Sequence, residues 1–469
     1  MSQFNRIASF VVASQLDTDE QTAAEIVAAS IDGNILIYSN SPRGTIGAVD
    51  ITDPSAPVGL GELDMGGEPT SVTVKGNLAL VAVNTSPNFV NPSGKLVAVD
   101  ISTAGILREW DLGGQPDSIA VSPDGNYVVI AIENERNEDL GDGGLPQLPA
   151  GNVVIVDTSS PSLINWTTTP ISLTGLASLT ENTDPEPEFV DISSENVAAV
   201  TLQENNAIVL IDLSTATVIR SFSAGTVDLT GVDTVEEDPA IIDQTGTLDD
   251  VLREPDGITF IGTDYIATAN EGDLDGGSRG FTIFDLEGNV VYDSGSELDQ
   301  IAAQVGHYPD GRSENKGNEP ENIEFGTFDG TDYLFVNSER SSLVFVYNVE
   351  DPTNPVFEQV LPAGVGPEGG KAIPDRNLFV VASEVDSRDD LIRSVINIYE
   401  YSDDLALYPT LQSVDGENGA PIPWSAMSGL AAGAGDTLYA VEDSFYGSNR
   451  FFTIDTSATP ASLTRSEEH

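Results

Sequence analysis

Seven copies of one pattern run through the chain from Ala24 to Glu400, and this internal repeat limits the fold more than any other feature. Most copies open with proline and an acidic residue, continue into an apolar run, and close after a loop with a second apolar run. The openings are AEIVAAS at Ala24, EPTSVTV at Glu68, QPDSIAV at Gln115, EPEFVDI at Glu186, EPDGITF at Glu254, EPENIEF at Glu319 and GPEGGKA at Gly366. The closing runs end at Asp50, Asp100, Asp157, Asp212, Asp285, Asn348 and Glu400.

The apolar runs are short and are separated by Gly, Pro, Asn and Asp, which indicates strands joined by turns rather than helices. Several copies add a fourth, edge-like strand, as in PVGLGEL, ILREWDL, ATVIRSF and PVFEQVL. Four short strands in a unit of about 45 to 70 residues are typical of a propeller blade, not of a sandwich or a solenoid. We therefore predict an all-β fold, a seven-bladed β-propeller with four-stranded antiparallel blades.

The two ends of the chain decide the number of blades and the domain boundary. The segment WSAMSGLAAGAGDTLYAVEDS after Pro423 also has the pattern of a blade opening, so eight blades are the alternative. If RIASFVV, from Arg6, instead supplies an outer strand to the last blade, the ring closes without the C-terminal residues. We place the propeller at residues 1–403, a linker at 404–423, and an extra blade or the beginning of a second domain at 424–469.

Long loops gather on one face of the predicted propeller. Connections into the first strand of a blade and between its second and third strands emerge on the same side. They are long at residues 133–151, 159–184, 225–253, 272–279 and 294–318. Functional groups concentrate on loops held by a rigid scaffold, so this side is the predicted working face.

The same face collects carboxylates in two rings. Acidic residues just ahead of the innermost strand are Asp117, Glu188, Asp256, Glu321 and Glu368, and those at or near the end of the next strand are Glu133, Glu204, Glu271, Glu339 and Glu384. Crowded carboxylates raise one another's pKa or recruit a cation. An acid after proline also commonly accepts backbone amide hydrogen bonds and fixes a turn. The turn role is the simpler interpretation for any one residue, and a ligand site is the better one for all ten.

The loop NEGDLDGGSRG is the best candidate for a calcium site. Glu271, Asp273 and Asp275 alternate along it and glycines allow a tight turn, although the full EF-hand pattern is absent. A solvated Gly-rich loop is the competing interpretation.

Few basic residues stand beside the rings, and they either neutralise carboxylates or hold an oxyanion such as phosphate. They are Arg253, Arg279, Lys316, Arg340 and Lys371.

Composition excludes several classes of function. The formal net charge of −58 repels polyanions, so nucleic acid is excluded as a partner. The chain has no cysteine and only two histidines, which argues against thiolate or His-rich metal sites and leaves oxygen-ligated ions such as Ca²⁺. No GxSxG, Walker or HExxH motif occurs.

No apolar run approaches the length of a membrane span, and no signal peptide is visible in this chain. So large an acidic excess suits a salty or calcium-rich medium, where screening reduces self-repulsion. We therefore expect an extracellular or cell-surface location.

Several strings resemble the choice-of-anchor I domain family, which is related to mesenchyme-specific cell-surface glycoproteins. They are AAEIVA around Glu25, DITDPSAPV from Asp50, QPDSIAVSPDG from Gln115, TLQENNAIVLIDL from Thr201, EPDGI from Glu254, TANEGD from Thr268 and GNEPEN from Gly317. The resemblance implies a propeller displayed outside the cell and often fused to phosphatase, nucleotidase or anchoring modules. The segment from Met427, MSGLAAGAGDTLYAVEDSFYGSNRFFTID, is similar to the opening of the phytase-like esterase domain of large secreted bacterial phosphatases.

Two functions remain in competition. The first is a module that binds calcium and presents a carboxylate-rich face to mineral, glycan, a phosphate ester, or a fused catalytic or anchoring domain. The second is a calcium-dependent phosphoesterase of alkaline phosphatase or phytase type, in which bound ions bridge a substrate phosphate and activate water.

Overall fold

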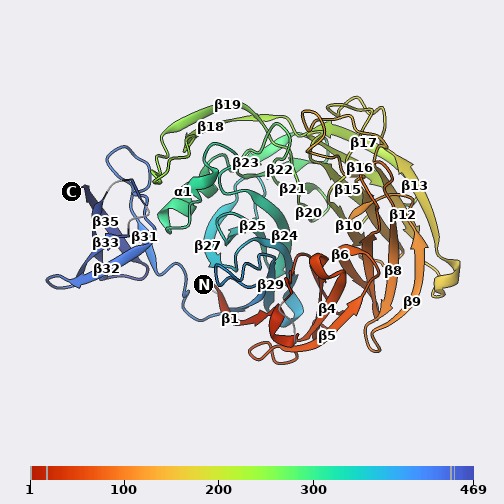
Figure 1. The fold of residues 1–469 in the computed structure, drawn as a ribbon, viewed down its shortest axis with the longest axis horizontal. Helices are drawn as coiled ribbons and strands as arrows, with labels where there is room; N and C mark the ends of the chain where they lie inside the picture. Colours follow the sequence, from red (N-terminus) through yellow and green to blue (C-terminus); the bar gives the residue numbers. More distant parts are fainter. Residues whose placement is uncertain (1–2, 17–19, 444–445, 448, 469) are drawn as a thin grey trace.

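The computed structural model describes residues 3–16, 20–443, 446–447 and 449–468. Nine sheets lie within this part of the chain, and seven of them have four antiparallel strands (Figure 1). The first four contain β2 (Val27–Ala29), β3 (Ile35–Asn40), β4 (Thr45–Asp50) and β5 (Val58–Asp64); β6 (Glu68–Lys75), β7 (Leu78–Asn84), β8 (Gly94–Asp100) and β9 (Gly105–Asp111); β10 (Pro116–Val121), β11 (Tyr127–Ile132), β12 (Asn152–Asp157) and β13 (Thr167–Ser172); and β14 (Val190–Ile192), β15 (Val197–Leu202), β16 (Ala207–Asp212) and β17 (Thr217–Ser223).

The remaining three four-stranded sheets contain β20 (Ile258–Ile261), β21 (Tyr265–Ala269), β22 (Phe281–Asp285) and β23 (Val290–Asp293); β24 (Pro320–Phe328), β25 (Thr331–Ser338), β26 (Leu343–Asn348) and β27 (Val356–Pro362); and β28 (Pro367–Ile373), β29 (Leu378–Ser383), β30 (Val395–Ser402) and β1 (Gln3–Val11). The strands β2, β6, β10, β14, β20, β24 and β28 contact one another in that order, and β28 contacts β2 again. The predicted all-β class and antiparallel four-strand units are confirmed.

Each four-stranded sheet buries its middle strands more than its outer one. In β11 and β12, runs such as Val128–Ile132 are fully buried between neighbouring sheets, which suits their β-branched composition. The outer strand β9 is mostly exposed instead, with the adjacent Ile106 and Leu107 facing solvent and only Trp110 buried, where it packs against Trp166. The core is therefore divided into clusters between adjacent sheets, with no single centre.

The N-terminal strand closes the ring. β1 pairs antiparallel with β30, from Gln3 opposite Ser402 to Val11 opposite Val395, so the first residues of the chain complete the last sheet. This is the closure predicted for RIASFVV. Phe4 is buried there and contacts the rings of Phe328 and Phe335 edge to face.

Two additions extend beyond the ring. A hairpin of β18 (Thr226–Val232) and β19 (Gly246–Leu252) is inserted before β20, and the helix α1 (Glu297–Gln304) and the 3-10 turn Asp310–Arg312 precede β24. The C-terminal sheet has the order β31 (Leu411–Ser413), β35 (Ala461–Glu468), β34 (Arg450–Asp455), β33 (Thr437–Glu442), β32 (Met427–Ala432). It lies beside the ring near α1 (Figure 1), and its Trp424 indole donates a hydrogen bond of 2.8 Å to the carbonyl of Gln304. The strand β31 falls inside the segment 404–423 that we expect to be a linker.

We expect Phe4→Ala to weaken ring closure. Truncating a buried aromatic side chain costs about 3 to 5 kcal/mol, because it leaves a cavity as well as removing apolar contact. Thermal melting should show a transition several degrees lower than that of the unaltered protein. Val11→Ala, at the exposed end of the same strand, is the control and should change stability by less than about 0.5 kcal/mol. Equal melting temperatures for the two variants would show that β1 does not close the ring in solution.

Candidate functional site

The acidic residues of the first ring sit where the innermost strands leave regular pairing. The register shifts between Pro116 and Ile119 in β10, between Pro320 and Asn322 in β24, and between Pro367 and Gly370 in β28. A bulge leaves a residue unpaired and re-aims its side chain. The shift at each proline therefore turns the following carboxylate out of the ladder and toward the channel.

These carboxylates line one cavity at the mouth of the channel. The five predicted residues Asp117, Glu188, Asp256, Glu321 and Glu368 all line it, so the structure brings the first predicted ring together. The other polar lining groups are small, namely Thr70, Ser71, Ser118 and Asn322.

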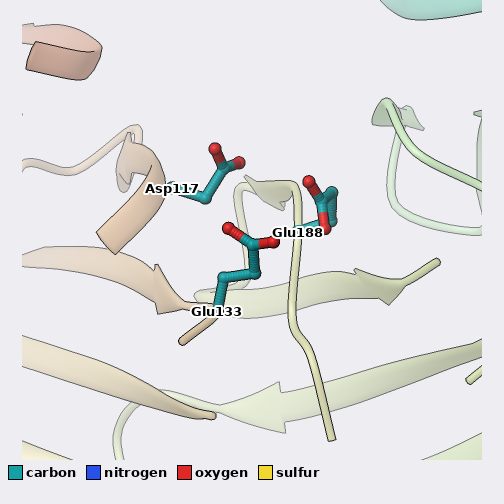
Figure 2. Close-up of side chains that lie close together, drawn as sticks. All are labelled: Asp117, Glu133 and Glu188. Carbon is teal, nitrogen blue, oxygen red and sulfur yellow. The ribbon is translucent and has the colours of Figure 1, made fainter. Parts of the chain in front are cut away.

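The second predicted ring adds carboxylates beside the first. Three groups have at least one oxygen from each member within 4.8 Å of the others, and they are Asp117 with Glu133 and Glu188, Asp256 with Glu271 and Glu321, and Glu271 with Glu319 and Glu339. Figure 2 shows the first group, in which Asp117, Glu133 and Glu188 come from neighbouring segments and their carboxylates converge. Glu271 belongs to two of the groups.

Burial and mutual repulsion raise the pKa values of these acids. Burial is the larger cause for Asp117, whose pKa rises to about 7, with further repulsion from Glu135 and Glu25. Burial also raises the pKa of Glu133 well above its usual range, and Asp117 and Glu204 add to the effect. The pKa values of Glu188, Asp256, Glu321 and Glu368 are raised well above their usual range for the same reasons.

Simple electrostatics shows why the groups need a proton or a cation. Two carboxylates 4.8 Å apart repel by about 3.5 kcal/mol at an effective dielectric constant of ~20. Protonating an ordinary glutamate at pH 7 costs about 3.7 kcal/mol. In a group of three ionised carboxylates each one meets two such repulsions, about 7 kcal/mol. A group of this kind that lacks a basic partner therefore favours uptake of a proton or a cation at neutral pH.

The turn-fixing interpretation of these acids fails for some of them. Glu188 Oε2 and Glu368 Oε2 are buried and have no hydrogen-bond donor. An unsatisfied buried carboxylate oxygen costs free energy unless a ligand meets it. The arrangement is therefore suited to hard cations bound by oxygen atoms, such as Ca²⁺.

Arg136 is one of the basic residues that the chain supplies at this face. It is 5% exposed and its guanidinium bonds Glu204 Oε1 at 2.6 Å and also Asp273. Its Nε donates to the carbonyl of Gly143 at 2.9 Å. One side chain from the loop after β11 thus joins the ends of two other sheets, and Arg136 still leaves Glu204 with a pKa raised to about 8 by burial.

The predicted basic residues divide between the mouth and other places. Arg340 lies at the mouth, where it pairs with Glu319 at 2.8 Å and Glu339 at 2.6 Å. It also lowers the pKa of Glu384, although burial raises that pKa by more. Lys316 faces Asp273 at 3.7 Å.

The other three basic residues lie away from the first ring. Arg253 is held by Asp293 Oδ2 at 2.8 Å and by the carbonyl of Ala224. Lys371 pairs with Glu324 at 2.7 Å and lines a deeper part of the channel. Arg279 is fully buried under the α1 segment.

The three acids predicted as a calcium loop point in different directions. Glu271 joins the ring, Asp273 pairs with Arg136, and Asp275 is exposed. The loop winds around a different carboxylate, because Glu254 accepts the amides of Asp273 and Leu274 at Oε2 and that of Asp275 at Oε1. The loop therefore does not gather these three side chains into one site.

Sequence reasoning missed a third column of acids. Glu186, Glu254 and Glu319 directly precede the proline of their openings, and each is at most 1% exposed. The repeated Glu-Pro dipeptide was the available signal. Glu25 occupies the same place in the first sheet as Glu321 in the sixth, since each carbonyl accepts the amide of the neighbouring innermost segment. No such signal pointed to the pairing of Arg136 with Glu204 and Asp273, because Arg136 is a single basic residue within the acidic segment ENERNED.

No helix in the described part of the chain is long and apolar enough to cross a bilayer. No curated protein matches the chain. Solved structures share its fold at low identity. The RRP9 WD40 repeats align with a TM-score of 0.57 and 8% identity, covering 85% of this chain and 100% of that one. Virginiamycin B lyase from Staphylococcus aureus aligns with a TM-score of 0.52 and 11% identity, covering 85% and 99%. The Cps50 (Swd1) β-propeller domain of Myceliophteria thermophila aligns with a TM-score of 0.50 and 12% identity, covering 84% and 99%.

These similarities identify the fold as a β-propeller and say nothing about chemistry. A family model described as the choice-of-anchor I domain matches residues 25–276 and 274–352, which is more than half of the chain and includes five of the seven repeat openings in full. The chain belongs to the choice-of-anchor I domain family.

Proposed function

We propose that this chain is an extracellular or cell-surface seven-bladed propeller module that binds Ca²⁺ at its channel mouth and presents this acidic face to a ligand or to a fused catalytic or anchoring domain. The seven four-stranded sheets with contacting innermost strands support the blade count. The observation that carries the calcium proposal is the set of three carboxylate groups with oxygens within 4.8 Å. Such groups offer the several oxygen ligands that Ca²⁺ takes.

The C-terminal sheet is proposed as the beginning of the phytase-like esterase domain that its sequence resembles. Its support is a small core of its own, formed by Ala440, Phe452, Ile454 and Leu463. Its strands β32 to β35 pair in order as in a blade, and β31 adds to β35 in parallel. The propeller would then be the partner module of a phosphatase.

Calcium should raise the melting temperature of the protein. An ion that binds only the folded state adds about 2.7 kcal/mol at a free concentration 100 times its Kd, and a chelator removes this gain. The double change Asp117→Asn with Glu188→Gln should reduce the calcium-dependent shift and the heat of binding in calorimetry. In chelator the same variant should melt no lower than the unaltered protein, because two repelling charges are gone.

Glu195→Gln with Asp264→Asn is the matched control. It also removes two negative charges, but from exposed turns, one between β14 and β15 and one between β20 and β21. It should leave the calcium shift intact. Equal loss of the shift in both double variants would contradict a site at the mouth and would indicate a general effect of net charge.

Without divalent cations, stability should fall as pH rises. The folded-state pKa values of Asp117, Glu271 and Glu339 are raised to about 7, and that of Glu204 to about 8. Because the folded state holds more protons than the unfolded state above pH 4, the stabilisation present at pH 4 is lost progressively between about pH 5 and pH 8.

Melting curves in chelator from pH 5 to pH 8 measure this loss. Calcium should reduce the slope, and its affinity should rise by ~10-fold per pH unit for each proton displaced. A melting temperature in chelator that rises over this window would contradict the proposed protonation of the mouth.

Phosphoester hydrolysis is a second candidate function. Glu271 is common to two neighbouring carboxylate groups, and Arg340 and Lys316 lie beside them. A two-metal phosphatase site needs two metal ions bridged by one carboxylate, with a positively charged side chain beside them.

We expect turnover of p-nitrophenyl phosphate, if this candidate is right, to require Ca²⁺ and to fall by at least ~100-fold in Glu271→Gln. The Glu195→Gln control should retain full turnover. A calcium-dependent rise in melting temperature with no turnover by the unaltered chain would rule out hydrolysis and leave the binding module.

A further inference from the structure

We propose that an apolar pocket between the first two sheets of the ring binds a small, uncharged aromatic molecule. We call this pocket the inter-sheet pocket. Ile46 of β4 and Leu63 of β5 line it from the first sheet, and Val99 of β8 and the following Ile101 line it from the second. It shares no lining residue with the cavity at the channel mouth. The inter-sheet pocket is therefore a separate site from the carboxylate rings.

The next boundary along the ring, between the second and third sheets, shows what such a space can hold. There Trp110 of β9 stacks on Trp166, with 5.3 Å between the ring centroids and 15° between the ring planes. Both tryptophans are buried and belong to the core cluster that joins these two sheets. Two stacked indole rings thus fill the outer part of that boundary.

Strand register shows that Leu63 is the equivalent of Trp110. Trp110 pairs with Leu96 of β8, and Leu63 pairs with Ile46 of β4. Leu96 and Ile46 each stand four residues before the acid that closes their repeat. The same position of the outer strand therefore carries an indole in the second sheet and a leucine in the first.

Ala104 is the equivalent of Trp166. Trp166 directly precedes the outer strand β13, and Ala104 directly precedes the outer strand β9. Ala104 and Leu63 both line the inter-sheet pocket. A leucine and an alanine thus stand where two stacked indoles close the next boundary, and they are too small to fill the same space.

A third small residue, Ala48, enlarges the pocket from the side of β4. It stands two residues before the acid that closes its repeat. The second repeat also has alanine there, Ala98, but the two tryptophans fill its boundary. The third to seventh repeats have a branched aliphatic residue at this position, namely Ile155, Leu210, Ile283, Val346 and Ile398. The first boundary alone therefore combines the small residue on the third strand with the loss of both indoles.

The lining selects an uncharged, apolar ligand. Glu62 is the only titratable group among the residues that line the pocket, and its carboxylate is already engaged. It accepts hydrogen bonds from Arg43 Nε at 2.9 Å and from Asn40 Nδ2 at 2.7 Å. Cavities with aliphatic walls stay dry and take up aromatic molecules such as benzene. A charged or sugar-like ligand would leave its polar groups without partners here, which costs free energy.

The wall formed by β5 is held in place and leaves the pocket open to solvent. Gln15, at the end of the 3-10 turn Val12–Gln15, accepts the amide of Gly61 at 3.0 Å and donates to the Tyr38 hydroxyl at 2.6 Å. These two bonds tie β5 to the turn and to β3, so the strand cannot move inward to close the space. Leu60, which is 55% exposed, lines the pocket on the same strand and marks its entrance. The pocket is therefore pre-formed, as sites for small molecules usually are.

Indole is the probe that tests the proposal, with its affinity measured by ligand-detected NMR titration and by calorimetry. We expect the unaltered chain to bind indole at one site. Leu63→Trp supplies the ring that Trp110 supplies at the next boundary, and Ala48→Ile supplies the side chain found in other repeats. Each should weaken indole binding by at least ~10-fold, because losing the burial of about two methylene groups is worth this factor. Neither variant should melt much below the unaltered chain, since each fills empty space.

Leu107→Trp is the matched control, because it makes the same substitution at an exposed position of β9 that does not line the pocket. It should bind indole as the unaltered chain does. All titrations contain chelator, so that ions at the channel mouth play no part. If one of the two pocket variants does not fold, the other carries the test. Absence of indole binding by the unaltered chain, unchanged affinity in a folded pocket variant, or an equal loss in Leu107→Trp would overturn the proposal.

Discussion

The close approach of the innermost strands at one channel is the constraint on which the rest of the structure depends. The backbones come so near that a Cβ on Gly257 would lie 2.7 Å from Asn322 Cα, and the amide of Gly257 donates to the carbonyl of Glu321 in the next sheet. Whatever follows the proline in each repeat is therefore carried to the same small space. Acids at that position cannot avoid one another, and their repulsion has to be met by protons or by a cation. The chemistry of the mouth thus follows from the geometry of the ring.

Basic side chains on the long loops of the working face neutralise only part of this negative charge. Arg136 reaches across from one sheet to Glu204 and Asp273 in the two that follow it, and Arg340 neutralises Glu319 and Glu339. Asp117, Glu188 and Asp256 line the mouth, and the described residues show no basic partner for them. A fold that required only neutrality could place a lysine in a ring position. Instead the basic side chains hold the outer acids and leave the inner ones free to act as ligands.

Sequence reasoning succeeded where the signal is periodic. The repeat predicts the strands, the antiparallel sheets and the first ring of carboxylates. Equivalent positions in repeated sheets lie at the same distance from the central channel, so their side chains form a ring. It failed where a contact joins segments that are distant in sequence. Asp273 and Asp275 alternate as calcium ligands do, yet Glu254 takes the amides of that loop and turns the two side chains apart. Arg253 and Lys371 stand beside ring positions in sequence but bond Asp293 and Glu324 in space.

The acids of the channel differ in their pairing between its deeper part and its mouth, and this difference supports the proposed function of the mouth. Deeper in the channel Lys371 meets Glu324 at 2.7 Å, so an acid on an innermost strand can be paired with a base from its neighbour. The described residues show no such pairing three positions nearer the mouth, where Glu321 and Glu368 occupy the same two strands. Surface charge tuned for solubility would have no reason to concentrate in a partly buried cavity, where each repulsion costs several times more than in water. In the function that we propose, a bound cation would convert this repulsion into binding affinity, which would account for the cost.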